Sequence, residues 1–398
     1  MNNLEFYLNI LQTILFVYLG GASLYLFFFA MAGLFYHKKS YGPESRQRHI
    51  TIIFPAFRED QIMEEVIQQT LQQTYTRFSI LLIADSFRQD VLERLRALPI
   101  TTIDANFEIS TKVNALKLAV QYLSSETEIV LVLDADNIPE PDLLGKVNES
   151  FASPFKVIQC HRMAKNINTK IALLDAISEE VNNHIFRQGH RCAGFSSALI
   201  GSAMAFDKAI FIRFVPILNA IAGFDKQLEL ELLRNRIRIE YLNNAYVLDE
   251  KVQNTQVFYK QRKRWIYAQL IYFGKDILRA TWHLIARGNL DYFDKTIQFS
   301  MPPRIVLLGL LFLINVADMF FRCSLLPTLW IIALAMNIVT LLISIPRRYY
   351  TLNTLTALLS LPGIFFLMVL MIFRLKGTNK EFIHTEHTYT GKNQYQST

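Results

Sequence analysis

Cysteine is scarce in this sequence of 398 residues, and the three that occur, Cys160, Cys192 and Cys323, lie far apart. Their spacing fits neither a zinc site nor a disulfide framework, so it argues against a disulfide-stabilised protein. Internal repeats and low-complexity tracts are also missing. A reducing compartment is the simplest interpretation of this cysteine content.

The sequence has no basic residue before its first long apolar run, residues 7–35, and no charged residue within it. The run exceeds the roughly 20 residues that a spanning helix needs. A cleaved signal peptide would be shorter and would show small residues at a cleavage site, so we expect a retained membrane anchor. Basic residues follow the run. By the positive-inside rule, they place the next domain in the cytoplasm.

Hydrophobic residues make up 52% of the chain and the mean hydropathy is +0.21, which is high for a soluble protein. The surplus lies at the amino end and in the last quarter of the chain. The net charge is +7, and basic residues cluster beside the apolar segments, for example at 37–39, 262–264 and 347–348. Anionic lipid headgroups explain this placement better than a nucleic-acid groove does. We therefore expect membrane lipids as partners and no nucleic acid.

Strand and helix patterns alternate between residues 49 and 246. Apolar runs predict strands at 49–54, at 78–84 and from 129 onward, with weaker candidates at 157–160, 203–206 and 240–241. Amphipathic spacing predicts helices at 62–73, 89–98 and 112–123. Such alternation indicates a parallel sheet covered on both faces by helices.

The most informative stretch is residues 129–139, IVLVLDADNIP, in which a buried strand ends abruptly at Asp134 and Asp136. Ligands of open α/β sheets bind outside the carboxyl ends of the strands. Two carboxylates one residue apart repel each other unless a cation lies between them. Mg²⁺ or Mn²⁺ carrying a diphosphate is the natural candidate. Solvated acids at a strand end are the alternative.

The first two predicted strands also end in polar loops, which converge on one ligand if the strands are parallel. Asp85 can accept the imide hydrogen of a uracil ring, and Pro55 and Ala56 allow the backbone to lie close to the base. Arg58 and Glu59 follow in the same loop. A helix start with Glu59 and Asp60 in its first turn explains those acids equally well.

Lys112 begins a predicted helix, so its ammonium group and the helix amino end can both face a phosphate. A solvated lysine is the alternative. Further along, Gly201, Ser202, Ala203 and Met204 form a small-residue loop that allows close approach of a sugar, although Gly201 equally suits a tight turn.

Asp225 precedes an amphipathic run and can act either as a general base or as a helix N-cap. The soluble part of the chain ends with Gln261, Arg264 and Trp265. Arg264 can bind a diphosphate leaving group, and Trp265 can stack on a sugar. A cation-rich turn at the membrane interface is the alternative for this segment.

Residues 266–287 mix aromatic and charged side chains, which predicts a helix lying in the membrane interface. Three apolar runs of near-spanning length follow, at 305–320, 329–345 and 352–373. We therefore expect about three spanning helices in this part of the chain. The tail is basic, and the positive-inside rule would keep it in the cytoplasm, whereas three spans would place it on the other side.

Together and in this order, the residues resemble the membrane-bound family 2 glycosyltransferases, which include cellulose and hyaluronan synthases. The resemblance covers residues 49–265 and the membrane layout. Its most specific parts are Asp134 and Asp136, which match a DxD motif, and Gln261, Arg264 and Trp265, which match QxxRW. The sequence departs from the family's TED motif, because Gly223 and Phe224 replace its Thr and Glu. Glu229 lies one helical turn onward.

The resemblance implies a GT-A-type fold, a Rossmann-like mixed sheet with helices on both faces, in a cytoplasmic domain joined to transmembrane helices. Residues 55–59 and Asp85 resemble the uracil-binding positions, and Lys112 the diphosphate contact. Asp134 and Asp136 resemble the nucleotide and metal acids, with Mg²⁺ or Mn²⁺ as cofactor. Residues 201–204 are similar to the loop beside the donor and acceptor sugars, and Asp225 stands at the position of the base.

The expected organisation is an amino-terminal anchor with a basic flank (1–47), a glycosyltransferase domain (48–265), an interfacial region (266–300), spanning helices (301–375) and a polar tail (376–398). The implied function is inverting transfer from a nucleotide sugar, with UDP as the expected nucleotide, to a growing polysaccharide or glycan. The expected location is the plasma (inner) membrane. Two alternatives remain open, namely a single transfer to a lipid-linked or short glycan acceptor, and an inactive membrane scaffold.

Overall fold

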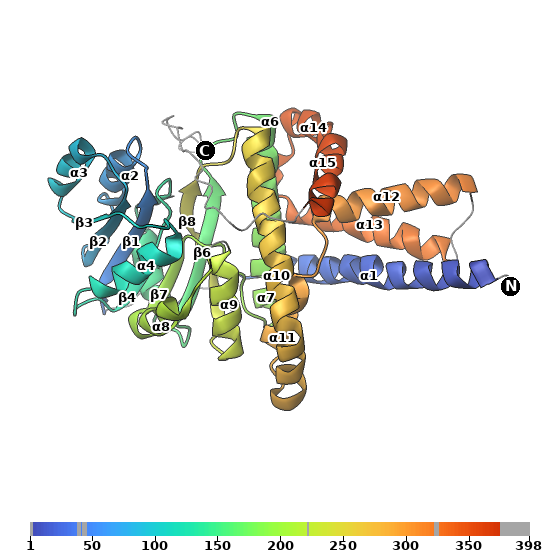
Figure 1. The fold of residues 1–398 in the computed structure, drawn as a ribbon, viewed down its shortest axis with the longest axis horizontal. Helices are drawn as coiled ribbons and strands as arrows, with labels where there is room; N and C mark the ends of the chain where they lie inside the picture. Colours follow the sequence, from blue (N-terminus) through green and yellow to red (C-terminus); the bar gives the residue numbers. More distant parts are fainter. Residues whose placement is uncertain (1–2, 38–40, 42–45, 221–222, 322–325, 375–398) are drawn as a thin grey trace.

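The computed structural model describes residues 3–37, 41, 46–220, 223–321 and 326–374. An α/β body lies on one side of the molecule and a group of long helices on the other (Figure 1). Most of the basic flank after the first apolar run, at 38–40 and 42–45, lies outside the described residues, and so does the polar tail at 376–398.

Among the described residues, the body is built on an eight-stranded sheet with the order β3-β2-β1-β4-β7-β6-β8-β5. Its strands are β1 (Ile50–Phe57), β2 (Phe78–Asp85), β3 (Thr101–Ala105), β4 (Ile129–Val132), β5 (Ile138–Pro139), β6 (Val157–Ala164), β7 (Met204–Asp207) and β8 (Ile239–Asp249). β1 to β4 pair in parallel, as the alternation predicted. β7 runs antiparallel to β4 and β6. The sheet is therefore mixed, and the parallel pairing that the alternation indicates holds for β1 to β4 but does not extend to β7.

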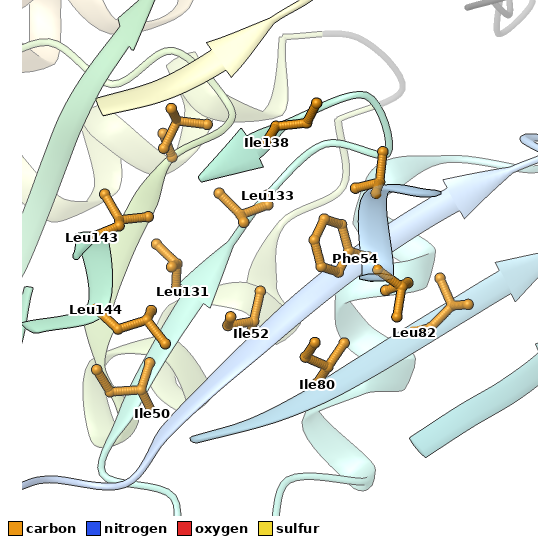
Figure 2. Close-up of a cluster of buried hydrophobic side chains, with 14 of the residues drawn as sticks. Ile50, Ile52, Phe54, Ile80, Leu82, Leu131, Leu133, Ile138, Leu143 and Leu144 are labelled. Carbon is orange, nitrogen blue, oxygen red and sulfur yellow. The ribbon is translucent and has the colours of Figure 1, made fainter. Parts of the chain in front are cut away.

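Successive side chains of the central strands point to opposite sides of the sheet. Both faces therefore carry apolar side chains, and helices cover both. Ile50, Ile52 and Phe54 of β1 pack in one buried cluster (Figure 2), whereas Ile53 packs in the other. The first cluster includes α2 (Met63–Thr70), α3 (Gln89–Arg96) and α5 (Leu143–Ser150), and the second includes α4 (Lys112–Gln121), α8 (Lys208–Phe214) and α9 (Phe224–Arg234). The expected GT-A-like arrangement of a mixed sheet with helices on both faces is confirmed.

Two strands were not predicted from the sequence patterns, and a third is longer than predicted. β3 reads Thr-Thr-Ile-Asp-Ala and lies at the sheet edge, where burial does not demand apolar residues. β5 has only two residues. β8 extends the candidate at 240–241 to eleven residues, with a register shift opposite Cys160 and His161 of β6. Such a bulge interrupts the alternation on which the strand prediction relies.

Three described helices are long and apolar enough to cross a membrane. They are residues Asn9–Leu34 of α1 (Asn3–Leu34), α12 (Arg304–Phe321) and α13 (Pro327–Ser344). The run expected as a further span, 352–373, is bent by 44° between α14 (Leu352–Leu358) and α15 (Leu361–Phe373). A proline in the first turn of α15 explains the break, because proline starts a helix well but cannot continue one.

One long helix, α10 (Thr255–Arg287), runs across the direction of α1 (Figure 1) and continues past residue 265, the expected end of the catalytic domain. It is followed by α11 (Leu290–Gln298). The apolar side chains of α1, α12 and α13 pack with those of α6 (Lys170–Asn182) and the π-helix η1 (Asn183–Gly189) in one cluster. The candidate membrane-spanning helices thus pack against the body. The remaining short helices are α7 (His190–Cys192), η2 (Val215–Ile217) and η3 (Arg347–Tyr349).

Candidate active site

A cleft of about 540 Å³ opens at the carboxyl ends of β1, β2 and β4 and continues along α6, α9 and α10. Segments from the whole length of the chain line it. Twelve of the site residues predicted from the sequence are among the lining residues, namely Pro55, Ala56, Glu59, Asp85, Lys112, Asp134, Asp136, Gly201, Asp225, Gln261, Arg264 and Trp265. The fold therefore brings both halves of the predicted site into one cavity.

Four predicted site residues do not line the cleft. Arg58 is exposed, with its guanidinium 5.0 Å from the ring centroid of Phe57. Ser202 is buried and accepts a hydrogen bond from the Asp134 backbone N–H at 2.9 Å. Ala203 and Met204 belong to the buried core of the sheet, one on each face. This segment therefore supports the aspartate loop, and only Gly201 faces the cavity.

A third acid joins the two aspartates that the sequence singled out. Asp134, Asp136 and Asp249 each offer one carboxylate oxygen, and these three atoms lie within 4.8 Å of one another. Asp249 is the last residue of β8, a strand that the sequence patterns only partly predicted, so its end could not be located. Carboxylate oxygens are the ligands that Mg²⁺ and Mn²⁺ prefer, and the cluster fits such an ion.

Hydrogen bonds and cations hold these acids in place. Asn137 donates from Nδ2 to Asp136 Oδ1 and to Asp249 Oδ1, both at 3.1 Å. Burial by itself would raise the pKa of Asp249, but Arg162 at 3.2 Å and Lys251 at 2.8 Å hold the pKa of that carboxyl below its ordinary value. Asp249 is therefore ionised at neutral pH, as a metal ligand must be.

Lys112 connects three segments at the centre of the cleft. Thr111 caps α4 by accepting a hydrogen bond from the backbone N–H of Asn114, so Lys112 lies in the first turn. Its ammonium group forms an ion pair with Asp134 and donates to the Gly201 carbonyl oxygen at 2.7 Å. It also lies 5.3 Å from the ring centroid of Phe224. Lys112 is thus a mostly buried cation of the site, and the alternative of a solvated lysine is wrong.

Asp225 lies in the first turn of α9, whose N-cap is Gly223 with a φ of 68°. The N-cap interpretation of Asp225 is therefore wrong. A Cβ atom at Gly201 would lie 3.7 Å from the Asp225 Cβ, so the small loop borders this side chain. Lys226 Nζ lies 3.3 Å from Asp225 Oδ2. Asp225 thus presents a carboxylate at the cleft wall, next to a cation.

Gln261, Arg264 and Trp265 lie on α10, so this segment is helical and the alternative of a cation-rich turn is wrong. Positions i, i+3 and i+4 share one face of a helix, which explains why all three line the cleft. Burial lowers the pKa of Arg264, and the Asp225 charge opposes this change. Among the described residues, the buried Gln261 Oε1 has no hydrogen-bond partner. This helix face therefore forms part of the cleft wall.

Residues 47–268 match the model of a family described as glycosyltransferase-like family 2. No curated protein matches the sequence. The structure resembles the mannosyltransferase PcManGT from Pyrobaculum calidifontis in complex with GDP-Man and Mn²⁺, with a TM-score of 0.52 and 17% identity over 84% of this chain and 99% of that one. At this identity the likeness shows the fold alone.

Two further solved structures are more distant. TarS of S. aureus has a TM-score of 0.39 and 14% identity over 76% of this chain and 50% of its own. Glucosyl-3-phosphoglycerate synthase from Mycobacterium tuberculosis, in complex with Mn²⁺, UDP and glucosyl-3-phosphoglycerate, has a TM-score of 0.38 and 15% identity over 53% of this chain and 75% of its own.

Proposed function

Because this chain belongs to glycosyltransferase-like family 2, we propose that it transfers a sugar from a nucleotide sugar, with inversion and with a divalent metal, to a membrane-associated acceptor. The observation that carries the proposal is the meeting of Asp134, Asp136, Lys112, Asp225 and Arg264 in one cleft. This complete set of charged groups speaks against an inactive scaffold.

The donor nucleotide would bind at the end of the cleft formed by β1 and β2. Pro55, Ala56 and Asp85 line that end. Asp85 is buried and faces the cavity, where its carboxylate can accept a hydrogen bond from the imide N–H of a uracil ring. UDP is therefore the proposed nucleotide. Asp134, Asp136 and Asp249 would hold Mg²⁺ or Mn²⁺, which neutralises diphosphate charge when bound.

The chain's own residues would promote a direct displacement. An acceptor hydroxyl oxygen attacks the anomeric carbon while the bond from that carbon to the diphosphate oxygen breaks, and the hydroxyl proton passes to the Asp225 carboxylate. Lys112 and Arg264 stabilise the departing diphosphate. Glu229 is less suited as the base, because its Oε1 is occupied by Lys295 at 2.8 Å and by the Leu199 N–H at 3.3 Å.

The acceptor would enter from the membrane side. The cleft continues past α10 to the segment before α12 and to Ile364 and Met368 of α15. Two acceptor classes fit this route, a growing polysaccharide or glycan chain and a lipid-linked or short glycan that receives a single sugar. Trp265 lies where the acceptor or donor sugar would stack.

We further propose an integral protein of the plasma (inner) membrane with its catalytic domain in the cytoplasm. Three apolar helices support membrane insertion. The basic segment after α13 lies against the catalytic body, because Arg348 contacts Glu180 of α6 at 2.5 Å. The positive-inside rule assigns that side to the cytoplasm.

A donor panel tests the function. The purified full chain, supplied with Mn²⁺ or Mg²⁺ and individual nucleotide sugars, should release nucleoside diphosphate from at least one of them, and a chelator should stop the release. Asp136→Ala should lower the rate by about 10²- to 10³-fold, the usual effect of removing one preorganised electrostatic contact.

Asp142→Ala is the matched control, because Asp142 is an exposed acid near the same loop that does not line the cleft. Its turnover should equal that of the wild type. Unchanged turnover of Asp136→Ala would contradict the metal assignment, and no release from any donor would contradict the proposed reaction. Mass spectrometry of the product then separates a polymer from a single transfer.

A further inference from the structure

Two arginines meet one face of α6 in the part of the cleft that lies towards the membrane helices. Arg262 of α10 forms an ion pair with Asp175. Arg304, the first residue of α12, donates to Asn182 Oδ1 at 2.7 Å and to the Ser178 carbonyl oxygen and Oγ at 3.1 and 3.2 Å. Positions 175, 178 and 182 follow one another along a single helix face. Both guanidinium groups therefore border the same stretch of cavity.

This stretch carries more positive than negative charge. The three hydrogen-bond acceptors of Arg304 are neutral, and among the described residues no carboxylate lies within ion-pair distance of it. Glu179, the next acid on α6, is already shared by Arg162, Arg187 and Lys251. The two guanidinium groups are close enough to repel each other. A partly buried cation with no ion-pair partner among the described residues is costly, so the site favours an anion.

Free hydrogen-bonding capacity lies beside this charge. The Nε atom of Arg262 is buried and has no hydrogen-bond partner among the described residues. The Arg262 guanidinium lies over the rings of Trp265 at 4.5 Å and Phe258 at 4.9 Å, which fixes its plane. An orphaned buried donor on a fixed guanidinium suits the oxygen of a phosphate, which arginine binds by several hydrogen bonds at once.

Apolar side chains line the part of the wall nearest the candidate membrane helices. Pro302, Pro303 and Ile305 line it from the segment at the start of α12, and Ile364 and Met368 line it from α15. α12 is one of the candidate membrane spans, and α15 belongs to the bent pair. A hydrocarbon chain that enters from the bilayer would therefore meet apolar side chains first and the two arginines next.

We propose that Arg262 and Arg304 form an anion site for the phosphate of a lipid-linked acceptor, whose hydrocarbon chain lies along the apolar side chains at the start of α12 and on α15. This inference rests on the proposed sugar transfer and selects between its two acceptor classes. The attacking hydroxyl then belongs to a molecule anchored in the membrane through its phosphate.

Calorimetric titration of the full chain in detergent with hexyl phosphate, hexanol and inorganic phosphate tests the site. Hexyl phosphate should bind at least about tenfold more tightly than inorganic phosphate, because it adds apolar contact, and hexanol should not bind at the same concentrations. Arg304→Gln should weaken hexyl phosphate binding by about 30-fold or more, the lower range for loss of a buried charged partner. Arg304→Lys, which keeps the charge, should retain most of the affinity.

Arg279→Gln is the control, since Arg279 lies on α10 as well but is exposed and outside the cleft. It should bind hexyl phosphate as the wild type does. Equal affinity for inorganic phosphate and hexyl phosphate would overturn the lipid assignment, and unchanged binding by Arg304→Gln would overturn the anion site.

The two proposals fail in different ways. Turnover with a nucleotide sugar but no binding of hexyl phosphate would overturn the acceptor assignment and leave the sugar transfer standing. Binding of hexyl phosphate by a chain that turns over no donor would refute the transfer while supporting the anion site. A neutral oligosaccharide glycosylated with equal KM by the wild type and Arg304→Gln would overturn the lipid-linked acceptor.

Discussion

At the scale of single residues, Asp249 has the largest effect on the interpretation of the site. It converts a pair of aspartates into a three-oxygen cluster, and it links that cluster to Arg162 and Lys251. A metal bound there would be held by ligands from β8 as well as from the loop after β4. The cations behind Asp249 keep its carboxylate ionised in a buried position.

Asp249→Asn should therefore weaken Mn²⁺ binding by at least about tenfold, because metal affinities fall by 10- to 100-fold even when only a residue behind the ligands is lost. Electron paramagnetic resonance of free Mn²⁺ measures the affinity directly, without any donor. Asp142→Asn should bind Mn²⁺ like the wild type. An unchanged affinity in Asp249→Asn would limit the metal site to Asp134 and Asp136.

Glu180 joins the catalytic body to the segment between the last helices. It contacts His161 of β6 at 3.3 Å and Arg348 of η3 at 2.5 Å. Burial by itself would raise its pKa, but His161 and Arg348 hold the pKa of Glu180 below its ordinary value of 4.5. The ionised carboxylate thus stabilises the fold above pH 4.5, and this contribution is lost as the pH falls through the lower pKa of the folded state.

Glu180→Gln should be less stable than the wild type by about 1–3 kcal/mol at pH 7, since a charged hydrogen-bond partner is lost. The difference in the free energy of unfolding between the variant and the wild type should narrow as the pH falls below 4.5. Denaturant unfolding in detergent at pH 7, 5 and 4 measures it. Glu93→Gln, on the exposed face of α3, is the control. A difference that stays constant with pH would assign the effect to packing.

At the scale of elements, the junction of α9 with α10 positions the proposed base. Gly223 begins α9 with a φ of 68°, and a Cβ atom there would lie 2.8 Å from the Cβ of Ala268 on α10. Glycine is therefore required both by the backbone conformation and by the close approach of the two helices. Asp225 lies two residues later, so its position depends on this contact.

Gly223→Ala should displace Asp225 and lower turnover by about 10²-fold, the effect of a misplacement of roughly 1 Å at a reacting group. Gly288→Ala is a matched control, because Gly288 has a φ of 61° but an added Cβ would meet nothing within 4 Å. Steady-state rates of both variants separate positioning from backbone strain. Equal losses in the two variants would show that strain alone is responsible.

At the scale of the whole molecule, α10 is the element that would link the catalytic body to the membrane in the proposed arrangement. Its first turns line the cleft, and it runs across the direction of α1 (Figure 1). Leu278, Trp282 and Ile285 lie on one face of its second half and are exposed by 83%, 64% and 75%. Apolar side chains on one face of a helix that lies across the spans are typical of an interfacial helix.

Trp282 should therefore reside in the interface of a lipid bilayer. In nanodiscs, lipids brominated near the headgroup should quench its fluorescence more strongly than lipids brominated at the chain ends, since interfacial helices insert only about 5–10 Å. The difference spectrum between the wild type and Trp282→Phe isolates this tryptophan. Equal quenching of the two proteins would place α10 away from lipid.

The sequence by itself determined the features that depend on short stretches of chain. Continuous apolar runs identified α1, α12 and α13 as membrane-spanning candidates, because helix length and the thickness of a bilayer are the only quantities involved. Alternating strand and helix patterns identified the parallel half of the sheet. Asp134 and Asp136 were evident because they end a buried strand.

Only the tertiary structure decided which distant groups share the cleft. Asp249 reaches the aspartates because β8 lies beside β6 and its end pairs with β5, which follows the aspartate loop. Pairing between segments so far apart in the chain is not recorded in a local pattern. Arg304 stands directly before an apolar run in the sequence, and only its packing against α6 shows that it has no ion-pair partner among the described residues. Residue patterns report local periodicity, whereas an active site depends on strand order and on the crossing of helices, which no local pattern records.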